Sequence, residues 1–122
     1  MPPAVRALRG ATTLDVDSSE HMHERVQALL TEMLSRNAVV HDDIISILFT
    51  ATDDVHSDFP ATAARPLGLG DVPLICAREL DIVHGASRCI RVLMHLVTDR
   101  ARADLRHVYL EGAKGLRDDL PE

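Results

Sequence analysis

The chain has 122 residues, 46% of them hydrophobic and 26% charged, with a formal net charge of -6. This composition is typical of one folded domain, which we expect to cover residues 1–122. One Tyr, two Phe and no Trp offer little for stacking on bases, and an acidic chain lacks the basic surface that nucleic-acid binding requires. Nucleic acid is therefore not an expected partner, and an anionic ligand would need a local cluster of cations.

The sequence shows no sign of membrane insertion or export. No apolar run reaches the roughly 18 residues that a bilayer span needs, and the N-terminus lacks the apolar core of a secretory signal. We therefore expect no membrane partner and a cytoplasmic location. Cys76 and Cys89 are too few for a disulfide framework or a four-cysteine zinc site. Free thiols are favoured, and one disulfide between them stays open.

The first predicted elements are a strand over residues 5–13 and a long helix over residues 18–36. Small and β-branched residues indicate the strand, which ends at an acidic turn. Asp17 with Glu20 three residues later predicts a capping box, and hydrophobic residues then recur at the 3.6-residue period as far as Asn37. One apolar stripe of this helix should pack on a sheet.

The rest of the chain predicts further strands around a loop. The apolar run at 44–49 is typical of a strand buried on both faces. Pro60 and Pro66 make 57–67 an irregular or single-turn helical loop, a place where ligand contacts often lie. Further strands are expected at 72–77, 88–97 and 105–110. The predicted fold class is α+β, a mixed sheet packed against one long helix.

The strand at 88–97 indicates self-association. Its alternation puts Ile90, Val92, Met94 and Leu96 on a core face, and Cys89, Arg91, Leu93 and His95 on the other. The second face is half apolar yet carries an arginine and a histidine, which suits a surface that another subunit covers around a polar site. Because one helix cannot cover both faces of the sheet, other copies of the chain are the simplest cover, with pockets where copies meet.

Generic catalytic motifs do not occur in the sequence. There is no glycine-rich phosphate loop, no GxSxG and no HExxH. His21 and His23 are two apart on the predicted helix and so diverge by about 200 degrees, which favours surface histidines over a shared metal. The other histidines are scattered, and we expect no metal and no cofactor.

Five short sequence motifs, which occur in a fixed order, are the strongest indication of the protein family. They are RGATT at 9–13, ATDDVHSDFPA at 51–61, VPLICARE at 72–79, CIRVLM at 89–94 and RHVYLE at 106–111, followed by Leu116, Arg117 and Asp119. In these motifs the chain resembles the monofunctional, trimeric, pseudo-α/β-barrel class of chorismate mutase. The resemblance spans about residues 5–119. Each motif alone is weak evidence, but five motifs in order, in a chain of the family's usual size, are specific for the family.

The resemblance implies a cofactor-free isomerase. Members of that family convert chorismate to prephenate, a Claisen rearrangement on the route to phenylalanine and tyrosine, at active sites between the subunits of a homotrimer. The substrate is a dianion that must fold into a chair-like shape while its ether oxygen gains negative charge. Such a reaction needs no nucleophile, so conformational confinement and placed positive charge must provide the rate.

The resemblance also implies roles for individual residues. Arg91 matches the cation that donates to the ether oxygen and a carboxylate, for which its planar fork is suited. Arg9 and Tyr109 match the pair that holds the pyruvyl carboxylate, and Glu79 matches the acceptor for the ring hydroxyl. The implied substrate-binding residues are Phe59 and Ala61 in an apolar wall, Leu74, Ile75 and Cys76 along the pocket, and Arg65 and Arg117 at its mouth.

Each of these residues also has an ordinary structural interpretation. Arg91 could be a salt-bridged interface arginine, Tyr109 a core-edge tyrosine, Cys76 a small buried hydrophobe, and Glu79, Arg65 and Arg117 solvated charges. Glu79 and Cys76 also differ in strand parity, so both can face one pocket only if the strand ends or bulges near residue 77.

Two departures from the family pattern predict weaker capture of the substrate. Thr62 stands where a lysine is common, and the tail after Asp119 is short. Both predict a higher KM with the chemical step preserved. Two other functions stay open: a trimeric sensor that holds a small carboxylate without converting it, and a related trimeric fold with imine-hydrolysing activity, whose sequence words are absent.

Overall fold

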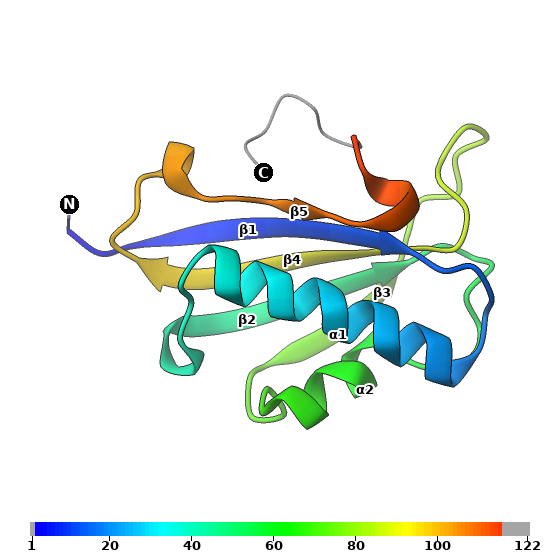
Figure 1. Ribbon diagram of the computed structural model, residues 1–122, viewed down its shortest axis with the longest axis horizontal. Coiled ribbons are helices and arrows are strands. Elements are labelled where there is room, and N and C mark those ends of the chain that lie inside the picture. Colours follow the sequence, from blue (N-terminus) through cyan, green and yellow to red (C-terminus); the bar gives the residue numbers. More distant parts are fainter. Residues whose placement is uncertain (1, 116–122) are drawn as a thin grey trace.

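The computed structural model describes residues 2–115, and within them five strands form one mixed sheet in the order β3-β2-β4-β1-β5. The strands are β1 (Ala4–Thr13), β2 (Ile44–Ala51), β3 (Leu74–Arg78), β4 (Cys89–Thr98) and β5 (Val108–Tyr109). The long helix α1 (Ser19–Arg36) crosses one face of the sheet, and the short helix α2 (Pro60–Ala64) packs beside it near β3 (Figure 1). The predicted α+β class, with a mixed sheet against one long helix, is confirmed.

Strand β4 is the middle of the sheet and brings distant segments to Arg91. It pairs antiparallel with β1 along its whole length and antiparallel with β2 on its other side. In this register Arg91 lies between Ala11 and Thr50. The two edge strands run parallel to their neighbours, β3 beside β2 and β5 beside β1. As a result, the ends of β1, β2 and β5 converge around the first residues of β4.

The hydrophobic core lies between the sheet and α1. Its α1 side chains are Met22, Val26, Leu29, Leu30 and Met33, all with no exposed surface. The even-numbered face of β4 lies opposite, as its alternation predicts, and each of its four side chains is at most 3% exposed. Gly10 allows this close approach, because a Cβ there would lie 2.5 Å from the sulfur of Met33. The backbone next to Arg9 is therefore part of a tightly packed layer.

The start of α1 differs from the prediction. The N-cap residue is Ser18, whose hydroxyl accepts from the His21 backbone N–H at 3.2 Å. The predicted capping box of Asp17 and Glu20 is therefore wrong. Asp17 instead accepts from two backbone N–H groups of the loop before α2, at 2.8 and 3.1 Å. A serine directly after the aspartate competes for the same role, since both are good caps.

Several strand boundaries also differ from the predicted ones. The segment 105–110 forms only the two-residue β5, because a tight turn precedes it and Asn37 of the α1 C-terminus takes the Arg106 backbone N–H at 2.7 Å. β3 begins at Leu74 rather than residue 72, after a turn and a proline without an N–H. The loop at 57–67 does contain the predicted helical turn, α2, followed by a 3-10 turn, Arg65–Leu67.

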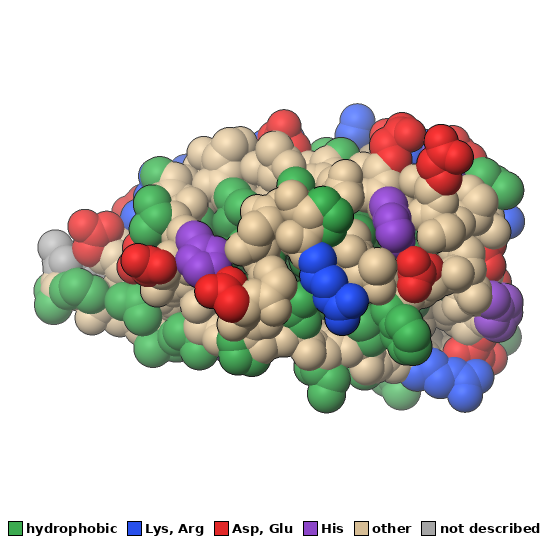
Figure 2. All heavy atoms as spheres, turned by 90° about the horizontal axis from the view of Figure 1, so that it is seen from below, with side chains coloured by type: hydrophobic (Ala, Val, Ile, Leu, Met, Phe, Trp, Pro, Cys, Tyr) green, Lys and Arg blue, Asp and Glu red, His purple; other side chains and the backbone are tan. Residues whose placement is uncertain are grey.

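The sheet face opposite the helices is uncovered in the single chain. The predicted burial of 44–49 on both faces does not hold there, because Ile45 is 42% exposed and Leu48 only half-buried. Val5 and Ile75 are 62% and 64% exposed. Seen from below the orientation of Figure 1, hydrophobic side chains gather along the lower left rim, while charged side chains are spread over the rest of the view (Figure 2). We call this uncovered side of the sheet the open face.

No described helix combines the length and apolar character needed to cross a membrane.

Candidate active site

Four predicted residues meet at one hollow of about 410 Å³ on the open face. They are Arg9, Glu79, Arg91 and Tyr109, joined in the lining by Gly10, Ala11, Leu48, Thr50, Val92 and Leu93. We call this the Arg91 hollow. It therefore combines two guanidinium groups, one carboxylate and one phenol with apolar walls, a composition that suits a small anion with a hydrocarbon body.

The register of the sheet explains why these four side chains meet. Arg9 and Arg91 lie two positions apart on the paired strands β1 and β4, on the same face. Tyr109 pairs with Ala11, next to Arg9, and is 2% exposed. Glu79 follows β3 directly, where its backbone N–H donates to the Ala51 carbonyl at 2.9 Å. Each group is thus held by a strand or by the first residue beyond one, which limits its movement.

The closest charged contact in the hollow joins Arg91 and Glu79. The Nε atom of Arg91 lies 3.2 Å from Oε2 of Glu79, with the two side chains 34% and 22% exposed. The Nε–H is nevertheless buried and makes no hydrogen bond to any described residue, so it is not directed at that oxygen. The hydroxyl of Thr50 donates to the same Oε2 at 2.7 Å. Arg91 is thus in an ion pair with Glu79, as the ordinary interpretation expects, but its buried Nε–H makes no hydrogen bond within that pair.

Cys89 lies two residues before Arg91 on the same face of β4, in a small cluster with Ala11, Tyr109 and Ala113. Burial raises the pKa of the Cys89 thiol, and the nearby Arg91 guanidinium opposes this shift without cancelling it. The thiol is therefore neutral around pH 7 and acts as a packing group. Cys89 and Cys76 are both free thiols, and no disulfide joins them.

The predicted substrate-binding residues lie away from the Arg91 hollow within one chain. Phe59 and Cys76 border a second hollow of about 660 Å³, between the end of β2 and the loop before α2. Leu74 and Ile75 border a small one of about 200 Å³, and Ala61 and Arg65 lie on α2 and the turn after it. Arg117 lies outside the described residues. Within one chain the described residues of this set are therefore spread over several places, none of which lines the Arg91 hollow.

Cys76 and Glu79 do not face the same side of the sheet, because β3 stays regular up to its end at Arg78. The strand pairs regularly with β2 from Leu74 to Arg78, without a bulge, and Cys76 pairs with the buried Phe49 on the helix side. Glu79 follows the strand and lines the open-face hollow. The two side chains thus lie on opposite sides of the sheet.

The loop that carries Phe59 is fixed by two carboxylates. Asp17 accepts from the backbone N–H groups of His56 and Ser57. Asp58 accepts from the Phe59 backbone N–H at 2.7 Å and pairs with the His23 side chain at 2.9 Å. The Phe59 backbone N–H and then the His23 side chain lower the pKa of Asp58. A phenylalanine that is 70% exposed is thereby held on a well-anchored loop.

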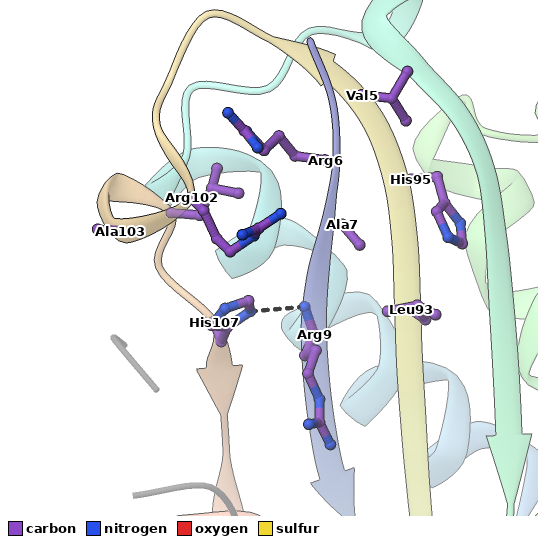
Figure 3. A pocket seen from close by; sticks show the side chains of 10 residues that line it. Val5, Arg6, Ala7, Arg9, Leu93, His95, Arg102, Ala103 and His107 are labelled. Carbon is purple, nitrogen blue, oxygen red and sulfur yellow. Dashed lines mark hydrogen bonds between the residues drawn. The ribbon is translucent and has the colours of Figure 1, made fainter. Parts of the chain in front are cut away.

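A third hollow of about 640 Å³ adjoins the Arg91 hollow and shares Arg9 with it. Arg6 and Arg102 extend between β1 and the segment before β5, while the Arg9 side chain points away from them along β1 (Figure 3). The Nδ1 atom of His107 accepts from the Arg9 backbone N–H at 2.9 Å, and this hydrogen bond holds the backbone of β1 at Arg9. Part of this hollow lies on the open face, so a second copy of the chain on that face would contact it.

Sequence reasoning missed Thr50, Asp58 and His107, and it misassigned Asp17. Thr50 carried a weak signal, since it and Ser46 are the two hydroxyl residues of a largely apolar strand, both on the side of Leu48. The other contacts depend on pairings between residues 35 to 98 apart in the chain, such as Asp58 with His23. No local pattern marks such pairings. Among residues 2–115, no three His, Cys, Asp or Glu side chains converge in a way that could hold a metal ion.

Comparison with known proteins bears on this arrangement. A sequence model of the family described as chorismate mutase type I matches residues 5–120. The chain is 40% identical over 117 residues to the chorismate mutase AroH of Bacillus subtilis, covering 95% of this chain and 92% of that one. It is 42% identical to the chorismate mutase AroH of Thermus thermophilus, covering 95% and 96%. A chorismate mutase structure from Clostridium thermocellum superposes with a TM-score of 0.87 at 45% identity, covering 89% of this chain and 97% of that one.

Proposed function

The chain belongs to the chorismate mutase type I family, and we propose that it rearranges chorismate to prephenate by confinement and placed charge in the Arg91 hollow. Its activity as a chorismate mutase, an isomerase of aromatic amino acid biosynthesis, follows from that membership. The mechanism rests on one observation: four charged or phenolic side chains from separate segments converge at a single hollow. We further place the enzyme in the cytoplasm.

The reaction breaks one C–O ether bond and forms one C–C bond within the same molecule. No atom enters or leaves, so no side chain has to accept or donate a proton. Negative charge grows on the ether oxygen as its bond lengthens, and the guanidinium of Arg91, which lines the hollow, is a donor suited to receive it. Because Arg91 is fixed by β4 and partly buried, its charge acts in a medium of lower dielectric constant than water.

The other three groups hold the substrate in its reactive shape. Arg9 and Tyr109 bind the pyruvyl carboxylate, and Glu79 accepts a hydrogen bond from the ring hydroxyl. Their positions support these roles, since Arg9 and Tyr109 adjoin across β1 and β5 while Glu79 lies on the far side of Arg91. A chorismate bound at both ends is bent between them, which lowers the entropy cost of reaching the transition state.

We propose that the complete pocket forms between copies in a homotrimer whose sheets close a pseudo-α/β barrel. Phe59, Ala61, Arg65, Leu74, Ile75 and Cys76 then reach the Arg91 hollow of a neighbouring copy, and Arg117 joins the mouth. Two observations support this arrangement. The open face carries exposed Val5 and Ile75, and the described substrate-binding residues do not line the Arg91 hollow within one chain.

The test is an assay of chorismate disappearance with purified protein, without added metal or cofactor. We expect turnover well above the uncatalysed rate, with prephenate as the only product. Binding of chorismate without turnover would overturn the proposal and favour the alternative of a carboxylate-binding sensor. The product is identified by NMR, so that any other reaction of chorismate is recognised.

A further inference from the structure

Thr50 is a polar residue of the Arg91 hollow to which the proposed mechanism gives no role. It lies on β2 directly opposite Arg91 of β4 and lines the same hollow. Its Oγ1 donates to Oε2 of Glu79 at 2.7 Å. The other carboxylate oxygen of Glu79 accepts from the Leu80 backbone N–H at 3.3 Å. The carboxylate is therefore held at both oxygens, once from β2 and once from its own loop.

Thr50 and Arg91 both approach the same oxygen, Oε2 of Glu79. A charge-assisted bond between a guanidinium and a carboxylate normally closes to about 2.7–2.9 Å. Here the Arg91 Nε atom stays at 3.2 Å and its N–H makes no hydrogen bond among the described residues. The neutral hydroxyl of Thr50 has the shorter contact, 2.7 Å. The carboxylate is thus oriented by Thr50 rather than by the opposite charge beside it.

We propose that Thr50 is a positioning residue that holds the Glu79 carboxylate off Arg91 and so leaves the Arg91 guanidinium able to turn toward the reacting molecule. This inference rests on the proposed function, because it assigns a donor of that guanidinium to the breaking ether bond. Without the hydroxyl, Oε2 of Glu79 turns to Arg91 and the two charges close into a hydrogen-bonded pair. Substrate then has to break this pair before its ether oxygen meets the donor.

The effect falls mainly on kcat rather than on KM. Arg91 interacts most strongly once the ether oxygen carries charge, whereas Arg9 and Tyr109 bind the substrate before the reaction. A hydrogen bond to a charged group is worth enough to change a rate about tenfold or more. For Thr50→Val, which keeps the shape and removes the hydroxyl, we expect kcat to fall at least about tenfold while KM changes less than about threefold.

Two further variants separate the hydroxyl from the shape of the side chain. Thr50→Ser keeps the donor and should retain kcat within about threefold. Thr31→Val makes the same change at an exposed position of α1, on the other side of the sheet from the Arg91 hollow. It should leave kcat unchanged. Thermal unfolding of all three proteins shows whether the fold is kept, and Thr50→Ala replaces the valine variant if that one unfolds.

The outcomes distinguish this inference from the function on which it rests. A wild-type protein that does not convert chorismate overturns both. An active wild type with Thr50→Val within about threefold in kcat, or a serine variant as slow as the valine variant, overturns the role of Thr50 alone. A crystal structure of the valine variant provides a readout independent of activity. Compared with a crystal structure of the wild type, it should show a hydrogen bond from Arg91 Nε–H to Glu79 Oε2 that the wild type lacks, and the same arrangement in both would contradict the inference.

Discussion

Arg91 combines three properties that a transition-state donor needs. It is partly buried, it has a carboxylate nearby that offsets the cost of its charge, and its Nε–H is not used by that carboxylate. A fully closed ion pair would stabilise the empty protein at the expense of the reaction, and an isolated buried charge would destabilise the fold. The arrangement with Thr50 and Glu79 lies between these extremes.

Thr62 offers a test of how the dianion is captured. It follows Phe59 on α2, and its hydroxyl lies 3.5 Å from Asp58. Thr62→Lys should lower KM about two- to fivefold, the range expected for one exposed charge contact, and leave kcat unchanged. Steady-state kinetics on chorismate measure this. Thr62→Gln, of similar length but neutral, is the matched control, and an equal fall in KM for both variants would show that charge is not the cause.

The sequence predicted the face on which Arg91 lies but not its hydrogen bonds. A period of two is enough to separate the core face of β4 from the face of Arg91, since alternation depends only on strand geometry. The contact between Thr50 and Glu79 depends on the register of β2 and β3 and on where β3 ends. No local pattern encodes that register. The convergence with Arg9 and Tyr109 came from the family resemblance rather than from any spacing.

The loop from His56 to Phe59 shows how one element can be fixed by side chains of another. Asp17 and Asp58 bind its backbone, and His23 of α1 pairs with Asp58. The loop has little hydrophobic packing of its own, so these hydrogen bonds set its position. In the proposed trimer this fixes the wall that Phe59 presents to the neighbouring copy.

The lowered pKa of Asp58 predicts a pH dependence of stability. Its charged form is favoured by the Phe59 backbone N–H and the His23 side chain in the folded state. The stabilisation is therefore present above the ordinary value of 3.8 and is lost as pH falls through the lowered folded value. Asp58→Asn should flatten the fall in the free energy of unfolding below pH 3.8, because asparagine does not titrate.

Urea unfolding at pH 6 and pH 3, followed by circular dichroism at one protein concentration, measures this effect. Asp43→Asn, at an exposed carboxylate before β2, is the control. If Asp58→Asn and Asp43→Asn show the same dependence on pH as the wild type, the Asp58 contacts do not contribute as described.

At the level of elements, long periodic segments were predictable and their ends were not. The 3.6-residue repeat identified α1, and apolar runs identified β2 and β4. Ser18 rather than Asp17 is the N-cap of α1, because the Asp17 carboxylate accepts hydrogen bonds from a loop about 40 residues away. This tertiary contact overrides the local capping preference of aspartate. β5 is short for a similar reason, since Asn37 takes a backbone N–H just before it.

At the scale of the whole molecule, the open face of the sheet is the surface that other copies cover in the proposed trimer. It carries apolar side chains next to the Arg91 hollow, and the described helices cover only the other face. Burial of such a surface is favourable by about 25 cal/mol for each Å² of apolar area removed from water. A trimer would bury it and complete the pocket in one step.

A charge placed on the open face should therefore break the assembly. Val5 on β1 and Val40 before β2 are 62% and 58% exposed in the single chain, so they form a matched pair. Val5→Glu should reduce the mass in solution from about 40 kDa, three copies of the 13.4 kDa chain, and abolish turnover. Val40→Glu should keep both. Light scattering measures the masses, and a wild-type monomer or an intact Val5→Glu trimer would contradict the proposed assembly.

The most direct test of the account is the rate of chorismate conversion by Arg91→Ala, measured on an assembly whose mass and thermal unfolding match the wild type. Removing one placed transition-state donor costs about 10²–10³ in rate, and we predict a loss of kcat at least this large. A variant that retains a rate near that of the wild type would contradict the central claim that the Arg91 hollow is where the ether bond breaks.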